Sequence, residues 1–103
     1  MNPSDIHVII RYRAQPGREQ AAIDELTALV AVVLAHESDC TGITIVQAEK
    51  DPGEIMLIET WTSRDAYVGP HLRTPHIVAF RERAPGIMAG PPDITFWHRA
   101  SGV

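Results

Sequence analysis

The chain has 103 residues, of which 45% are hydrophobic and 21% charged, a globular composition that excludes a disordered or fibrous chain. A formal net charge of -4 gives no general basic surface, so neither nucleic acid nor an anionic membrane is expected as a partner. The single cysteine, Cys40, cannot form an intrachain disulfide, and no signal peptide is evident, so we expect a cytoplasmic protein.

Residues 6–13 predict a β-strand, because their side chains alternate with a period of two residues. One face would carry Ile6, Val8, Ile10 and Tyr12, and the other His7, Ile9, Arg11 and Arg13. A helix is then expected from the Pro-Gly pair at 16–17 to about His36, because apolar side chains recur every three or four residues. Its buried stripe would be Ala22, Leu26, Leu29 and Val33.

Residues 43–61 predict a β-hairpin. Its two strands, 43–47 and 55–61, are rich in β-branched and other apolar side chains. Between them, Pro52 and Gly53 suit the two central positions of a type II turn, because proline fixes φ and glycine permits a positive φ. The hairpin would place the two strands side by side and antiparallel.

The rest of the chain predicts two helical segments and a strand. Ser63 can cap a short helix, which the Gly-Pro pair at 69–70 interrupts. Thr74 can cap a second helix, because a proline follows it at the favoured first helical position. That helix would end at 85–86, and residues 93–99 alternate again and predict a fourth strand.

The resulting order, β-α-β-β-α-β, is that of a ferredoxin-like α+β unit, and residues 1–103 are expected to form one domain. Two helices cover only one face of a four-stranded sheet. The third strand is nevertheless apolar on both faces from Ile55 to Ile58, and such a strand requires cover on both sides. We therefore expect a homodimer packed sheet against sheet, with Arg11 and Arg13 pairing with acids of the second copy.

Three stretches stand in a recognisable order along the chain. Residues 12–19 read Tyr-Arg-Ala-Gln-Pro-Gly-Arg-Glu, residues 59–67 read Glu-Thr-Trp-Thr-Ser-Arg-Asp-Ala-Tyr, and residues 71–76 read His-Leu-Arg-Thr-Pro-His. Together they resemble the antibiotic biosynthesis monooxygenase (ABM) domain of the dimeric α/β barrel superfamily, over about residues 6–99. The resemblance implies a homodimer through the sheet face and a pocket between the sheet and the helices of each subunit.

The resemblance also implies roles for three side chains. Trp61 and Tyr67 match an aromatic pair that lines the substrate pocket of cofactor-free monooxygenases, and Arg81 matches an arginine that helps to bind substrate. An aromatic wall can stack on a flat phenolic ring, while a phenol and a guanidinium hold its oxygens. From the residues alone, Trp61 and Tyr67 also suit plain packing positions in the core.

Two branches of the family use side chains that this chain lacks. Leu57 stands where the cofactor-free branch has an asparagine, four residues before the tryptophan. The haem-degrading branch has an asparagine, a tryptophan and a ligand histidine where this chain has Ile10, His71 and Arg81. Haem cleavage is therefore not expected, and Ile10 and Leu57 become candidate substrate contacts.

His71 and His76 flank the start of the last predicted helix. Because they lie five residues apart across a cap, they do not share a helical face, and no metal site is expected. Either imidazole can accept a proton when neutral, or both can bond loop carbonyls and hold the turn. Glu59 lies on an apolar strand face, where we expect a salt bridge to an arginine or a contact with a histidine.

The resemblance and the cluster of histidines and aromatic residues favour a cofactor-independent monooxygenase that oxidises a small phenol, anthrone or hydroquinone with O2 to a quinone. His71 would be the base, with Tyr67 and Arg81 as donors to the oxyanion. Substrate contacts would come from Trp61, His76, Ile10 and Leu57. Two alternatives stay open: a non-catalytic dimer that binds a small aromatic ligand, and an isomerase that works without O2.

Overall fold

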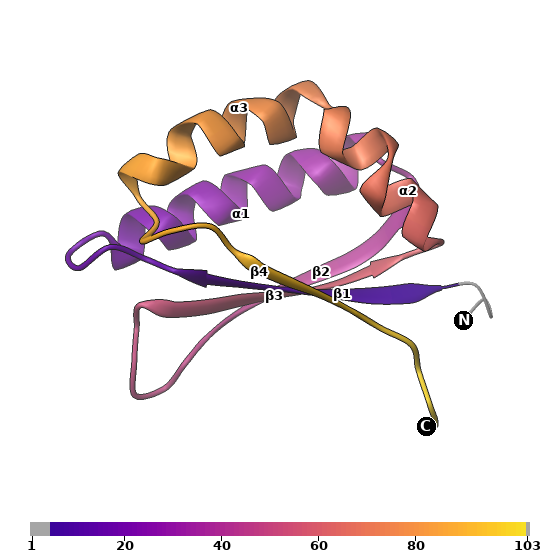
Figure 1. The fold of residues 1–103 in the computed structure, drawn as a ribbon, viewed down its shortest axis with the longest axis horizontal. Helices are drawn as coiled ribbons and strands as arrows, with labels where there is room; N and C mark the ends of the chain where they lie inside the picture. Colours follow the sequence, from indigo (N-terminus) through magenta and orange to yellow (C-terminus); the bar gives the residue numbers. More distant parts are fainter. Residues whose placement is uncertain (1–4, 103) are drawn as a thin grey trace.

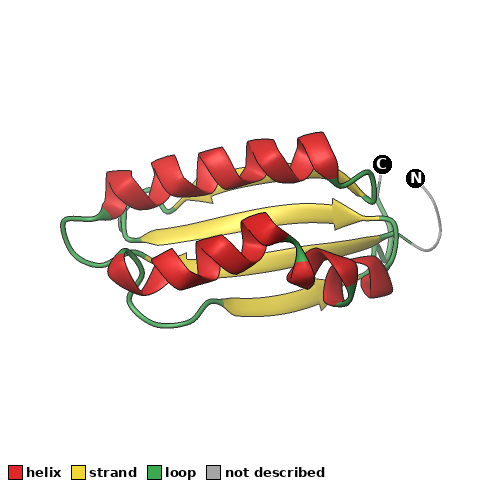
Figure 2. Ribbon diagram, turned by 90° about the horizontal axis from the view of Figure 1, so that it is seen from above, coloured by secondary structure: helices red, strands yellow, loops and turns green. Residues whose placement is uncertain are grey.

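The computed structural model describes residues 5–102, which form a four-stranded antiparallel sheet with the helices on one face (Figures 1 and 2). The elements are β1 (Ile6–Arg13), α1 (Glu19–His36), β2 (Cys40–Gln47), β3 (Glu54–Trp61), α2 (Arg64–Val68), η1 (Pro70–Arg73), α3 (Pro75–Arg83), η2 (Ala84–Gly86) and β4 (Asp93–Trp97), η marking a 3-10 helix. The strand order is β2-β3-β1-β4, which confirms the predicted ferredoxin-like α+β fold. No helix within residues 5–102 is both long and apolar enough to cross a membrane.

The core lies between the sheet and the two longer helices. The face of β1 that carries Ile6, Val8, Ile10 and Tyr12 is buried beneath the helices, as the alternation predicts. The buried side chains of α1 are Ala22, Leu26, Leu29 and Val33, and the helix ends at His36, so this prediction is also confirmed. Removing these apolar surfaces from water is the main favourable contribution to folding.

β2 begins earlier than the sequence predicts. Its pairing with β3 starts at Cys40, opposite Trp61, and shifts register before Gly42, opposite Thr60. Such a bulge interrupts the side-chain alternation from which a strand is predicted, so the first three residues of β2 were missed. The Cys40 side chain is buried, as expected for a plain thiol, and burial raises its pKa to about 12.

The turn between β2 and β3 is not the predicted type II turn. It closes with a hydrogen bond from the Glu54 N–H to the Asp51 carbonyl, 3.0 Å long, but Gly53 does not have a positive φ. A Cβ on Gly53 would lie 2.8 Å from Nη1 of Arg13, so a larger residue there would displace the guanidinium end of that exposed side chain.

The segment that follows β3 returns the chain over the sheet. The Ser63 hydroxyl accepts a hydrogen bond from the Ala66 N–H at 3.1 Å, which confirms the predicted cap of α2. Thr74 does occupy the N-cap position of α3, but its hydroxyl donates to the His71 carbonyl at 2.9 Å instead of capping the helix. The threonine therefore fixes the backbone of η1 at His71 rather than the first turn of α3.

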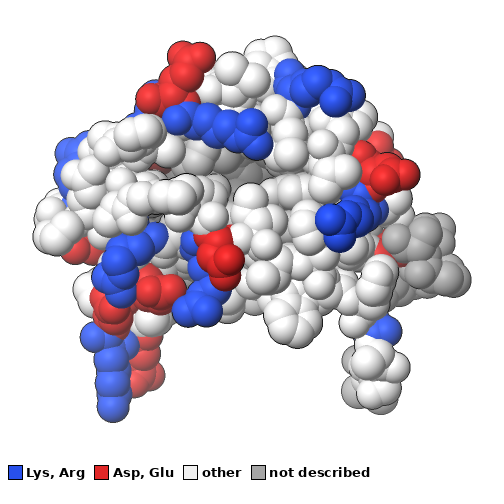
Figure 3. Space-filling view, in the orientation of Figure 1, with Lys and Arg blue, Asp and Glu red and all other residues white. Residues whose placement is uncertain are grey.

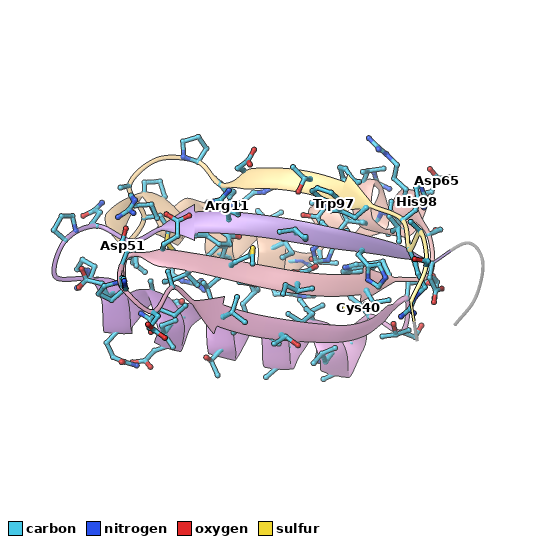
Figure 4. All side chains as sticks on the ribbon, turned by 90° about the horizontal axis from the view of Figure 1, so that it is seen from below. Arg11, Cys40, Asp51, Asp65, Trp97 and His98 are labelled. Carbon is cyan, nitrogen blue, oxygen red and sulfur yellow. The ribbon has the colours of Figure 1, made fainter. Side chains whose placement is uncertain are left out.

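The second face of the sheet has no helix over it within residues 5–102 (Figure 4). Ile58, on the inner strand β3, is 37% exposed, and Trp97, on the edge strand β4, is 54% exposed. Apolar side chains in the middle of a sheet are usually covered. This face is therefore apolar and uncovered, which is the feature from which the sequence predicts a second copy.

Arg11 and Arg13 form ion pairs within the chain. Nη2 of Arg11 lies 3.2 Å from Oε1 of Glu54, and Arg13 pairs with Asp51 and, at 3.1 Å, with Glu54. Figure 3 shows acidic and basic side chains gathered at the lower left, around the β2–β3 turn. Both arginines thus have acidic partners on the neighbouring β2–β3 hairpin, and their pairing with acids of a second copy stays a prediction.

Candidate active site

A cavity of about 760 Å³ lies between the helices and the inner face of the sheet, where the sequence predicts a pocket. Much of its lining is apolar and includes Leu29, Val33, Ile43, Ile77, Phe80 and Met88. The polar and charged side chains in the lining are Tyr12, Gln15, Glu59, His71 and Arg81. An apolar cavity with a few convergent polar groups is the usual form of a small-molecule site.

The residues predicted from sequence fall into two groups. Those that line the cavity are Ile10, Leu57, His71 and Arg81. Trp61 and Tyr67 are buried beside His71, and His76 contacts Glu37; none of these three belongs to the lining.

His71 has one ring nitrogen bonded and the other directed to the cavity. Its Nδ1 lies 2.9 and 3.0 Å from the two carboxylate oxygens of Glu37, the residue that follows α1. Nε2 has no hydrogen-bond partner within residues 5–102, where every fully enclosed polar side-chain atom has one, so Nε2 must open onto the cavity. The carboxylate therefore favours the tautomer with the proton on Nδ1 and the lone pair on Nε2.

The surroundings of His71 favour the neutral imidazole. Burial lowers the pKa of His71, and this effect outweighs the opposing effect of the Glu37 carboxylate. The positive charge of Arg81 lowers the pKa of His71 further. At neutral pH the ring is thus uncharged, and Nε2 can accept a proton from a ligand in the cavity.

Glu37 also bonds His76. Nε2 of His76 lies 2.7 Å from Oε2 of Glu37, whose side chain is only 11% exposed. Bonds to two imidazoles satisfy this nearly buried carboxylate. Of the two alternatives for these histidines, bonding to loop carbonyls is not what the structure shows, because Glu37 reaches both from 34 and 39 residues away in the chain.

Aromatic side chains hold the imidazole of His71 in place. Its ring centroid lies 4.5 Å from that of Trp61 and 4.9 Å from that of Tyr67. Trp61 and Tyr67 meet edge to face at 5.5 Å, and Tyr67 meets Phe96 of β4 in the same way at 5.7 Å. Edge-to-face contacts of this kind fix ring orientation.

Glu59 is a buried carboxylate on β3 that lines the cavity and is 3% exposed. Its Oε1 accepts a hydrogen bond from Nε1 of Trp61 at 2.8 Å. The expectation of a salt bridge or a histidine contact is wrong, because this indole N–H is its hydrogen-bond partner among residues 5–102. Burial raises the pKa of Glu59 to about 7; the charge of Glu37 adds to the rise and the Trp61 bond opposes it.

Tyr12 and Arg81 add donors to the cavity. Burial and the negative charge of Glu59 raise the pKa of Tyr12 and of Tyr67, so both phenols stay protonated. Arg81 acts electrostatically on both tyrosines, and its guanidinium is the one permanent positive charge among the lining side chains within residues 5–102. An anionic oxygen in the cavity would find its strongest stabilisation near this group.

Sequence analysis missed Glu37, Tyr12 and Gln15 as site residues. Gln15 donates hydrogen bonds to the carbonyls of Pro85 and Met88 at 2.8 and 3.3 Å, which fixes the chain at one end of the cavity. The place of Tyr12 on the inward face of β1 could have identified it as a site residue, whereas nothing in the sequence around Glu37 does so.

Residues 5–102 contain no group of three or more His, Cys, Asp or Glu side chains arranged to hold a metal ion.

Comparisons with known proteins identify relatives of this chain. Residues 5–83 match the protein family described as antibiotic biosynthesis monooxygenase. The chain is 34% identical over 89 residues to the "Probable quinol monooxygenase YgiN" of Escherichia coli (strain K12), an alignment that covers 77% of this chain and 84% of that protein.

Solved structures share the fold. PA3566 of Pseudomonas aeruginosa superposes with a TM-score of 0.83 at 26% sequence identity, over 95% of this chain and 96% of that chain. Rv0793 of Mycobacterium tuberculosis superposes with a TM-score of 0.82 at 23% identity, over 96% of this chain and 98% of that chain. At 23% identity this second likeness concerns the fold alone.

Proposed function

The chain belongs to the antibiotic biosynthesis monooxygenase family, and from this premise we propose that it is a cofactor-free monooxygenase that oxidises a phenol, anthrone or hydroquinone to a quinone. One observation carries the proposal: the Glu37–His71 pair presents an unprotonated Nε2 to a largely apolar cavity. The likeness to a protein named as a probable quinol monooxygenase supports the substrate class.

In the proposed reaction, His71 removes the proton of the substrate hydroxyl. The Glu37 carboxylate stabilises the imidazolium that forms, and Arg81 and Tyr12 stabilise the oxyanion on the substrate. Tyr67, which is packed on His71, joins Trp61 in holding the imidazole against the cavity. Ile10 and Leu57 contact the apolar part of the substrate.

The oxidation itself needs only O2 and the substrate anion. The anion transfers one electron to O2, and the two radicals combine into a peroxide on the ring carbon. The peroxide takes up the proton that His71 holds and then loses water. A phenol with a hydrogen on the para carbon thus gives a quinone, because one atom of O2 stays on the ring and the other leaves as water. The largely apolar lining of the cavity shields the anion and the peroxide from bulk water.

We also propose that the protein is a cytoplasmic homodimer. The uncovered sheet face, with Ile58 and Trp97 exposed on it, supports a second copy as its occupant. The unpaired thiol of Cys40 suits a reducing compartment.

The test is O2 uptake by the purified protein with a panel of hydroquinones, anthrones and phenols, together with quinone formation. Wild type should consume one O2 for each quinone formed, at a rate well above His71→Ala, which controls for spontaneous oxidation. Equal rates for the two proteins would overturn the proposal. A ligand that raises the melting temperature without O2 uptake would favour the binding-protein alternative, and an isomerised product formed anaerobically would favour the isomerase.

A further inference from the structure

Glu59 is the one ionisable group in the cavity lining, within residues 5–102, that the mechanism above leaves without a role. Its Oε1 accepts the Trp61 indole N–H, whereas Oε2 has no hydrogen-bond partner in that part of the chain. Every fully enclosed polar side-chain atom there has a partner, so Oε2 opens onto the cavity. A carboxyl group so placed can donate to a ligand or accept from it.

Glu59 and His71 flank the same indole. Trp61 donates its N–H to the carboxyl of Glu59, and its ring lies 4.5 Å from the imidazole of His71. The two groups thus reach one cavity from β3 and from η1, and their environments act in opposite directions, toward a neutral imidazole and a neutral carboxyl. A neutral base and a neutral acid in one cavity can take a proton from a ligand and give one to it.

The proposed reaction contains a step for an acid. When the peroxide breaks down, its O–O bond breaks and the outer oxygen leaves, which needs a proton to depart as water. We propose that Glu59 is the general acid that donates this proton, an inference that rests on the proposed monooxygenase function.

The proton balance closes within the cavity. His71, which has returned its first proton to the peroxide, takes the proton from the ring carbon, and the electron pair of that C–H bond forms the C=O bond. The O–O bond breaks at the same time, and the leaving oxygen takes the proton of Glu59. His71 then passes its proton to the Glu59 carboxylate, and both groups return to their starting state.

Several ionisable groups surround Glu59, and their charges influence the pH at which it loses its proton. They are Tyr12 from β1, Glu37 after α1, Cys40 from β2, Tyr67 from α2, His71 from η1 and Arg81 from α3. Burial raises the pKa of Tyr12, Cys40 and Tyr67, so these three stay neutral. Glu37 favours the protonated form of Glu59, whereas the Trp61 bond favours the carboxylate.

The test compares wild type, Glu59→Gln and Trp61→Phe. Glutamine keeps the size of the side chain and an oxygen for the Trp61 bond, but it has no acidic proton. In Glu59→Gln we expect quinone formation to fall about 100-fold. In a single turnover O2 should still be consumed, and the missing quinone should be recovered as peroxide. Melting temperatures at pH 6 establish that both variants fold.

The pH dependence separates an acid from a structural group. Wild-type quinone formation should decline above about pH 7, where Glu59 loses its proton. Glu59→Gln should lack this decline, and Trp61→Phe should move it to higher pH, because the indole bond that favours the carboxylate is gone.

Two results would overturn the acid role while leaving the monooxygenase intact: an unchanged alkaline decline in Glu59→Gln, or equal losses of O2 uptake and quinone in a single turnover. Failure of wild type to consume any O2 would instead overturn the proposed function and, with it, the acid role. In that case the infrared carbonyl band of a protonated carboxyl, compared between wild type and Glu59→Gln, still reports whether Glu59 holds a proton.

Discussion

The carboxylate of Glu37 meets the imidazole of His71 across 34 residues of sequence, with Oε1 2.9 Å from Nδ1. The carboxylate lies one residue beyond the end of α1, and the imidazole lies in the short 3-10 helix η1 and lines the cavity. The pair couples the orientation of the proposed base to the end of the longest helix. The consequences can be measured separately for Glu37, for the two histidines, for Arg81 and for Glu59.

Replacing Glu37 with glutamine should lower kcat by about 10- to 100-fold, because the amide no longer stabilises the imidazolium or enforces one tautomer. KM should change little, since Glu37 does not line the cavity. Steady-state O2 uptake measures both values. Glu49→Gln, which removes an exposed carboxylate, is the matched control and should match wild type.

The two histidines should differ, although both bond Glu37. His71→Gln should lower kcat by about 100-fold or more, because the proton acceptor is lost. His76→Gln should stay within about threefold of wild type, because His76 does not line the cavity and only supports Glu37. Steady-state kinetics of the two variants, measured in parallel, test this difference. Similar losses of kcat in both would contradict the choice of His71 as the base.

Arg81→Gln should weaken oxyanion stabilisation and also change the pH profile. Arg81 lowers the pKa of His71, so its removal should raise that pKa. The acid limb of kcat/KM, where His71 becomes protonated, should therefore move to higher pH. A profile from pH 5 to 8 shows the shift, and an unchanged acid limb would mean that His71 is not the titrating group.

Glu59 should make wild type less stable as the pH rises. The pKa of Glu59 is raised from 4.5 to about 7 in the folded protein. Between these values the folded state holds a proton that the unfolded state has released, so the free energy of unfolding falls with rising pH, by up to about 3 kcal/mol. Urea unfolding at pH 4.5 and pH 8 should show this fall in wild type and a smaller one in Glu59→Gln.

The uncovered sheet face should hold the proposed homodimer together. Ile58→Glu places a charge in the middle of that face and should shift the protein toward monomer in analytical ultracentrifugation. Val78→Glu, at a similarly exposed position on α3, is the control and should leave the sedimentation unchanged. A wild-type monomer at micromolar concentration would contradict the dimer.

Periodic features of the fold could be predicted from the sequence because each depends on neighbours along the chain. The burial of Leu26 and Val33 on α1, and of Val8 on β1, follows from side-chain spacing alone. The Ser63 cap is equally local. The type of the turn at Gly53 was predicted wrongly, because glycine permits a positive φ without requiring one.

The candidate site could be predicted only in part. His71 and Arg81 were found through a family resemblance, and both line the cavity. Glu37 was not found, since an acidic residue after a helix is ordinary and only the tertiary fold brings it to the two histidines. The predicted partner of Glu59 was wrong, because Trp61, two residues away on the same strand face, had been considered only as an aromatic surface and not as a hydrogen-bond donor.

The position of Glu37 restricts how the length of α1 can vary. The helix has 18 residues and is about 27 Å long, and each added or deleted residue would turn its end by about 100°. One such change would carry the Glu37 carboxylate away from both histidines, even if the apolar face of the helix repacked. Insertions in the turn, at the exposed residues 48–52, would not move it. Among natural variants of this chain, length differences should therefore gather in that turn and spare the eighteen residues of α1.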